Sequence, residues 1–228
     1  MRKTMCRGLA LFVMMTCAPG AQAEDTSAGA KPHAELPADP APDLAPAEAP
    51  AVAKRHATLP ADAPLDPASI YQLESKWTRA DGETVALPSL RGKPRVLAIF
   101  YSSCEFACPI VVGRMKAIQA AIPEARRDAA GFVLVSMDVA NDDPSKLADY
   151  AKRMDLQGDW TLLRGKDGDV RELAALLGFR YRQEQDGGFA HSNMITVLDG
   201  EGRVAHQSIG LDTDLADAIA ATNGLLGP

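Results

Sequence analysis

The sequence predicts an α/β domain, because strand-like and helix-like patterns alternate along it and end in an antiparallel pair. Two continuous apolar runs of strand length, Arg95–Tyr101 and Gly131–Met137, are typical of strands buried on both faces. A segment with helical spacing of its apolar residues follows each run. The chain then offers Met194–Leu198 and Arg203–Ile209 as two strands, joined by the turn Asp199–Gly202.

The other elements complete this pattern in chain order. Trp77–Leu87 predicts a hairpin, because Asp81-Gly82 separates two short stretches of mixed polarity. Trp160–Leu163 is short and apolar. Helices are predicted over four ranges: Pro109–Ile122, Pro144–Met154 with Asp143 as its cap, Val170–Leu177 stopped by Gly178, and Thr213–Asn223 capped by Asp212 or Thr213. The order βαβ and then ββα is that of a thioredoxin-like fold, here over residues 65–228 with an N-terminal hairpin extension.

The first 23 residues have the pattern of a secretory signal peptide. Arg2, Lys3 and Arg7 are followed by the apolar stretch Leu9–Ala18, and Ala21-Gln22-Ala23 supplies small residues for cleavage. We therefore expect an exported, periplasmic protein that is soluble after cleavage. The alternative is that residues 8–23 stay as an anchor in the cytoplasmic membrane, with the domain facing the periplasm.

Residues 24–64 are predicted to be a disordered linker. Glu24–Pro60 contains 11 Ala and 7 Pro and no aromatic residue. Such a composition buries too little apolar surface to offset the loss of conformational entropy, and its prolines favour extended backbone.

The overall composition excludes several classes of protein. Hydrophobic residues make up 46% of the chain and charged residues 24%, as in an ordinary globular protein. The net charge of −6 lacks the basic footprint of a nucleic-acid binder, so no nucleic-acid partner is expected. Four cysteines are too few for a disulfide-built scaffold of 228 residues, and two of them, Cys6 and Cys17, fall in the signal peptide.

The remaining two cysteines, Cys104 and Cys108, lie between a predicted buried strand and a predicted helix. Residues four apart are one helical turn apart, so the two sulfurs can converge on a metal or on each other. A helix N-terminus favours an anion, which lowers the pKa of a thiol there. Two thiolates suit a soft ion, and Cu(I) is the soft metal that two ligands can hold.

Two other interpretations of the cysteine pair compete with copper binding. A structural disulfide is common in exported proteins, but this one would close a very short loop and constrain the unfolded chain little. Zinc prefers four ligands, and the domain offers only His191 and His206 besides the cysteines.

The motif Cys104-x-x-x-Cys108-Pro109, following Ile99-Phe100-Tyr101, resembles that of the Sco (SenC) family of copper-handling assembly factors of cytochrome c oxidase. So does the segment Gly188–Gly202, in which His191 precedes a strand and an Asp-x-x-Gly turn. Ser136–Pro144 is similar to the Asp-containing segment of the family. The resemblance covers about Tyr71 to Gly210.

This resemblance implies one copper per chain, as Cu(I) or Cu(II), bound by Cys104, Cys108 and His191. An imidazole added to two thiolates gives a set that can hold either oxidation state. We expect His191 to lie in a loop held by the scaffold. Asp138, at the end of a predicted strand, could orient a ligand from outside the coordination sphere. His206 is interpreted as an ordinary strand residue.

The function implied by the resemblance is that of a metallochaperone. It would deliver copper to, or prepare, the CuA site of cytochrome c oxidase or another exported acceptor, and would take copper from a periplasmic donor. The alternative is a thiol-disulfide oxidoreductase in which Cys104 and Cys108 reduce the cysteines of the acceptor. A peroxiredoxin-like peroxidase is disfavoured, because that family has a Thr three residues before its cysteine and this chain has Tyr101.

Overall fold

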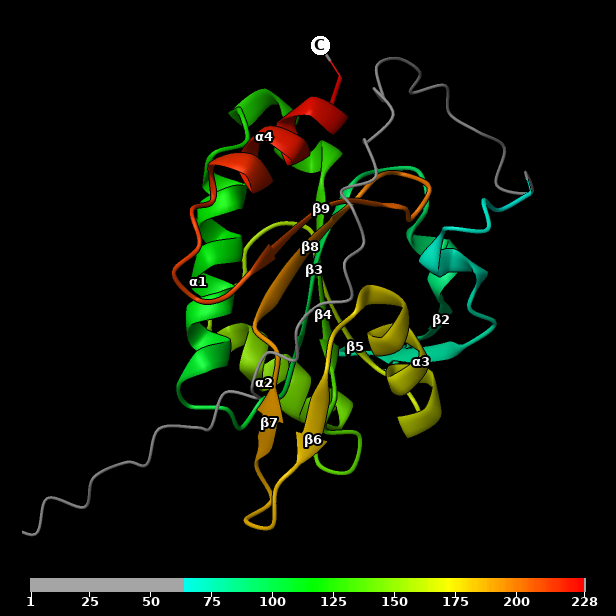
Figure 1. Ribbon diagram of the computed structural model, residues 1–228, viewed down its shortest axis with the longest axis vertical. Coiled ribbons are helices and arrows are strands. Elements are labelled where there is room, and N and C mark those ends of the chain that lie inside the picture. The colour runs from blue at the N-terminus through cyan, green and yellow to red at the C-terminus, as the bar shows by residue number, and fades with distance from the viewer. Residues whose placement is uncertain (1–63, 228) are drawn as a thin grey trace, which may run out of the picture. The chain divides into compact units, whose positions relative to one another are not determined.

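The computed structural model describes residues 64–227 (Figure 1). The predicted signal peptide, and the predicted linker up to residue 63, lie outside the described residues. A seven-stranded sheet with the order β2-β1-β5-β4-β3-β8-β9 forms the centre of the described part. Its strands are β1 (Lys76–Arg79), β2 (Thr84–Ala86), β3 (Arg95–Phe100), β4 (Gly131–Ser136), β5 (Trp160–Arg164), β8 (Met194–Leu198) and β9 (Val204–Ile209).

Strand β3 lies inside the sheet and is hydrogen-bonded along both edges. It pairs in parallel with β4 in a register that runs from Arg95 opposite Gly131 to Phe100 opposite Ser136. It pairs antiparallel with β8, with Arg95 opposite Leu198. Every residue of β3, β4 and β8 is buried, as the apolar runs predict. The antiparallel pairing brings the start of β8 to the carboxyl end of β3.

Four helices pack against this sheet: α1 (Ala107–Ala120), α2 (Pro144–Arg153), α3 (Asp167–Leu177) and α4 (Ala216–Leu225). In Figure 1, α1 and α4 lie beside each other, away from α3. The predicted cap of α2 is confirmed, since the Asp143 carboxylate accepts a hydrogen bond from the backbone N–H of Lys146. Gly178 ends α3 in the left-handed conformation, as predicted.

Three helix starts differ from the prediction, and one of them is that of α3, which begins at Asp167 instead of Val170. Helix α1 begins at Ala107, two residues before Pro109, so that Cys108 belongs to its first turn. Helix α4 begins at Ala216 instead of Thr213, and neither predicted cap is used. The hydroxyl of Thr213 instead donates to the carbonyl of Ile209, and Asp214 accepts from the N–H of Ala216. The Thr213 hydroxyl is therefore engaged within the loop before α4 and does not cap the helix.

The N-terminal hairpin is confirmed as β1–β2, and β1 joins the main sheet by antiparallel pairing with β5. A second hairpin, β6 (Tyr181–Gln183) with β7 (Phe189–His191), was not predicted. It forms a separate two-stranded sheet and carries His191 at its end. Its strands have three residues each and pair only with each other. Three residues are too few to show the alternation of apolar and polar side chains that predicts a strand.

A short 3-10 helix, η1 (Ile70–Gln72), packs against the predicted turn between β8 and β9. The Ile70 N–H donates to the Gly202 carbonyl at 3.0 Å, and the buried Tyr71 ring lies against the Gly202 backbone. Two more 3-10 helices complete the described part: η2 (Leu87–Leu90) and η3 (Glu124–Ala129). Within residues 64–227, no helix is both long and apolar enough to span a membrane.

Two glycines with positive φ separate the effect of backbone strain from that of packing. Gly202 has a φ of +79°, and a Cβ there would lie 2.6 Å from the Tyr71 ring. Gly82 has a φ of +88° and open space around it. We expect Gly82→Ala to lower the free energy of unfolding by about 1–2 kcal/mol. Gly202→Ala should lower it by a further 1–3 kcal/mol, roughly, from overlap with the ring. Denaturant unfolding measures both; equal losses would contradict the packing of η1 on the turn.

Candidate metal centre

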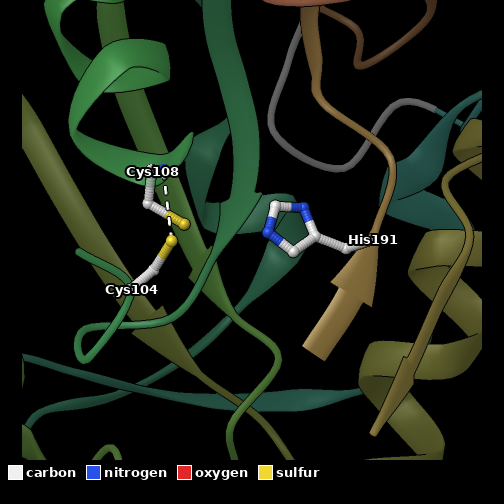
Figure 2. A group of neighbouring side chains, drawn as sticks. All are labelled: Cys104, Cys108 and His191. Atoms are coloured by element: carbon white, nitrogen blue, oxygen red, sulfur yellow. Dashed lines mark hydrogen bonds between the residues drawn. The ribbon is translucent and has the colours of Figure 1, made fainter. Parts of the chain in front are cut away.

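Cys104, Cys108 and His191 converge at the carboxyl end of β3. Their ligand atoms all lie within 4.8 Å of one another. Figure 2 shows the two sulfurs side by side, with the imidazole of His191 facing them across a short gap. Cys104 comes from the β3–α1 loop, Cys108 from the first turn of α1, and His191 from the end of β7. The three side chains are 5%, 1% and 9% exposed, so the group is largely shielded from solvent.

The cysteines are free thiols that occupy different positions relative to α1. Cys104 precedes the helix, and its sulfur accepts a hydrogen bond from the backbone N–H of Cys108 at 3.3 Å (dashed line in Figure 2). The sulfur thus satisfies one of the N–H groups that a helix start leaves without an intrahelical partner. The two residues therefore meet through a loop and a first turn, and not on one helical face as the spacing had indicated.

This arrangement separates the acidities of the two thiols. A hydrogen bond from the Cys108 side chain lowers the pKa of the Cys104 thiol to about 3 against the opposing effect of burial. His191 and the backbone N–H groups of Phe106 and Cys108 act in the same direction. The pKa of Cys108 is raised, because its proton is shared with Cys104 and its side chain is buried. The reduced pair therefore holds one thiolate, centred on Cys104.

His191 is fixed by its surroundings in an orientation suited to binding a metal. Its Nδ1 lies 2.9 Å from the Ser192 carbonyl, which can only accept, so Nδ1 carries a proton. Figure 2 shows Nε2 turned toward the sulfurs: a proton on it donates to the Cys104 thiolate, and without that proton its lone pair is available to a metal. Tyr101 meets the ring edge-on and Phe179 stacks on it. His191 ends a strand, whereas the sequence had indicated a loop.

A buried carboxylate that sequence analysis missed supports the loop before Cys104. Asp142, 1% exposed, accepts hydrogen bonds from the backbone N–H and hydroxyl of Ser102 and from the Ser136 hydroxyl. It thereby ties the β4–α2 loop to the β3–α1 loop. Asp142 is one of three aspartates between Ser136 and Pro144, and the sequence pattern offered a role for Asp138 and for Asp143 but none for Asp142.

Asp138, which was predicted to orient a ligand, shapes the same β4–α2 loop. Its carboxylate accepts hydrogen bonds from the backbone and the side chain of Asn141, and its carbonyl accepts the Asp142 N–H. These bonds hold Asp142 in position. Asp138 therefore acts on the β3–α1 loop only indirectly, through Asp142. Its proposed role in orienting a ligand stays a prediction. His206 lies in β9, paired with Ser208 through Nε2, and is not part of the group.

The fold and the site define a class of protein: an α/β domain of thioredoxin-like order, with two cysteines at a helix start and a histidine brought to them by a hairpin. The SCO1/SenC family model matches residues 67–226, and the chain belongs to this family. The SCO1 protein homolog of Bacillus subtilis (strain 168) is 28% identical over 129 residues, which is 56% of this chain and 60% of that protein.

Solved structures share the fold. A SCO1/SenC family lipoprotein from Bacillus anthracis str. Ames superposes with a TM-score of 0.61 and 23% identity, covering 67% of this chain and 94% of its own. Bradyrhizobium japonicum ScoI with copper bound has a TM-score of 0.57 and 20% identity, covering 66% and 96%. At such identities the likeness establishes the fold, and the predicted thioredoxin-like architecture is confirmed.

The shared proton of the cysteine pair leads to a test by pH titration. The reduced protein should keep the ultraviolet absorbance of one thiolate down to about pH 5, where an ordinary thiol of pKa about 8.5 is protonated. Cys108→Ala should raise the pKa of Cys104 more than His191→Ala does, because the Cys108 side chain makes the largest contribution. A larger shift in the histidine variant would reverse this order and refute the shared-proton arrangement.

Proposed function

We propose that this protein is an exported copper metallochaperone that delivers copper to, or prepares, the CuA site of cytochrome c oxidase. The observation that carries the proposal is the convergence of the ligand atoms of Cys104, Cys108 and His191 within 4.8 Å, at largely buried positions. Copper is here the cargo of the protein, and these three residues are its proposed ligands.

The donor set fits copper on chemical grounds. Two sulfurs suit Cu(I), and an imidazole nitrogen beside them extends the set to Cu(II). The Cys104 thiolate supplies negative charge without prior loss of a proton, since its pKa is lowered in the metal-free form. The Cys108 thiol would lose its proton on binding, so that copper uptake releases a proton at neutral pH.

Relatives support this choice of cargo. Bradyrhizobium japonicum ScoI, Arabidopsis thaliana ScoI and yeast Sco1 have each been solved with copper bound. The proposed acceptor is the oxidase subunit that carries CuA, or another exported copper or thiol acceptor, and a periplasmic protein is the proposed donor. Export depends on residues 1–23, acting as a cleaved signal or as an anchor.

A second function rests on the two free thiols. Cys104 and Cys108 lie close enough for thiol-disulfide exchange, and the lowered pKa of Cys104 favours its attack on a disulfide at neutral pH. A reductase would use the pair to keep the acceptor's cysteines reduced. His191 separates the two functions, because copper binding needs its imidazole and dithiol exchange does not.

Copper titration of the reduced chain tests the ligand set. We expect one copper per chain in metal analysis and absorption. His191→Ala should weaken Cu(II) binding by more than the roughly tenfold that the loss of an outer-shell partner costs, with a much smaller effect on Cu(I). The matched control is His206→Ala, which removes an imidazole from β9 and should leave both affinities unchanged. Unchanged Cu(II) affinity in the His191→Ala variant would show that His191 is not a copper ligand.

Complementation of a deletion strain separates carrier from reductase. If the protein carries copper, the His191→Ala variant should fail to support CuA assembly at low copper, and added copper should restore assembly. Cys104→Ser and Cys108→Ser should fail under either function. CuA content, measured in isolated membranes, reports the outcome. Full assembly by the His191 variant under copper limitation would favour the reductase.

A further inference from the structure

A groove of about 730 Å³ opens beside Cys104, and His191 is not among the residues that line it. It lies outside the carboxyl ends of β3 and β4, where α/β sheets commonly bind ligands. One wall is the β3–α1 loop, from Ser102 to Glu105, and the other is α2 with the loop before it. Cys104 lines the groove, whereas Cys108 does not. Of the two sulfurs, Cys104 is therefore the one that an incoming group meets there.

A buried hydroxyl in the groove lacks a partner. Tyr150 of α2 is 1% exposed, lines the groove, and its hydroxyl makes no hydrogen bond within residues 64–227. The guanidinium of Arg153 lies over its ring at 5.1 Å and donates to the Ser102 carbonyl, which holds the ring in place. Leaving a buried polar group unpaired costs about 1–3 kcal/mol. A ligand that pairs with this hydroxyl recovers that free energy.

The charges around the groove indicate what kind of ligand it accepts. Four exposed charged side chains line it, and they balance: Lys146 and Arg153 against Glu105 and Asp149. The buried Asp142 carboxylate and the Cys104 thiolate also line the groove and make its lining negative on balance. Such a lining disfavours a strongly anionic ligand. A polypeptide segment fits better, because its backbone is neutral and offers donors and acceptors together. The volume is also within the range of ligand-binding pockets.

We infer that this groove holds an extended, cysteine-bearing segment of the partner protein, with a backbone group of the segment paired to the Tyr150 hydroxyl and its sulfur directed to Cys104. The inference rests on the proposed function, since both copper transfer and thiol exchange require a partner sulfur to reach Cys104. It adds the place where that partner binds and names Tyr150 as a residue that positions it.

Thiol exchange with metal-free protein tests the groove. The full chain carries Cys6→Ser, Cys17→Ser and Cys108→Ser, so that Cys104 is its one thiol. The probes are a neutral peptide of about ten residues, roughly 35 Å long when extended, with one central cysteine, and N-acetylcysteine amide, each joined through a disulfide to thionitrobenzoate. The Cys104 thiolate attacks the probe sulfur, a new disulfide forms, and thionitrobenzoate leaves as a coloured thiolate.

The readout is the ratio of the two second-order rate constants, in which changes in the reactivity of Cys104 itself cancel. We expect the peptide to react faster than the single residue by about fivefold or more, and Tyr150→Phe to remove most of that gain. The matched control is Tyr181→Phe, which deletes another buried, unpartnered hydroxyl outside the lining of the groove and should keep the ratio. Equal rates for both probes, or an equal ratio in Tyr150→Phe, would overturn the inference.

A second variant tests the balance of charge on a different residue. With the unchanged groove, a peptide with basic flanks should react faster than one with acidic flanks, because Asp142 and the Cys104 thiolate line the groove. Lys146→Glu, on the exposed rim, should increase this preference, and indifference to this change would count against the groove. Because no metal is present, these results are independent of the copper titration, whose failure would refute the proposed function alone.

Discussion

The pairing of β3 with a strand on each side is the constraint on which the site depends. The parallel ladder to β4 and the antiparallel ladder to β8 hold β3 inside the sheet, so its carboxyl end is fixed. The same antiparallel register turns the start of β8, and with it His191, toward that end. His191 is 83 positions from Cys108 in the chain. The backbone hydrogen bonds of the sheet bring the two together before any side chain of the site contributes.

The start of α1 then makes the two cysteines unequal. Cys104 lies before the helix and receives its N–H groups, while Cys108 lies inside the first turn and is buried. Hydrogen bonding and burial act on Cys104 in opposite directions, and hydrogen bonding prevails. One sulfur is therefore an anion beside a groove, and the other keeps its proton in the core. The proposed copper binding and the alternative thiol exchange would both use this asymmetry, so variants of the cysteines alone do not separate the two functions.

Support for the site comes from two sides of the sheet end. Asp142 ties the loop of the cysteines to the loop after β4, and the β6–β7 hairpin holds the histidine from the other side. The aromatic rings of Tyr101 and Phe179 enclose the imidazole. Cys104 also borders the groove, which His191 does not line, and a partner segment is inferred to bind there.

The sequence by itself determined the elements whose residues form a clear local pattern. The buried runs of β3, β4 and β8, the capped helix α2 and the turn before β9 follow from local patterns, and the cysteine spacing indicated a soft metal or a redox pair. Only the tertiary structure decided the β6–β7 hairpin, the start of α4, the choice of Asp142 among neighbouring aspartates and the location of the thiolate. Each of these depends on groups distant in sequence: His191 and Cys104 are neighbours because of strand pairing, and a pKa depends on what surrounds a group in space.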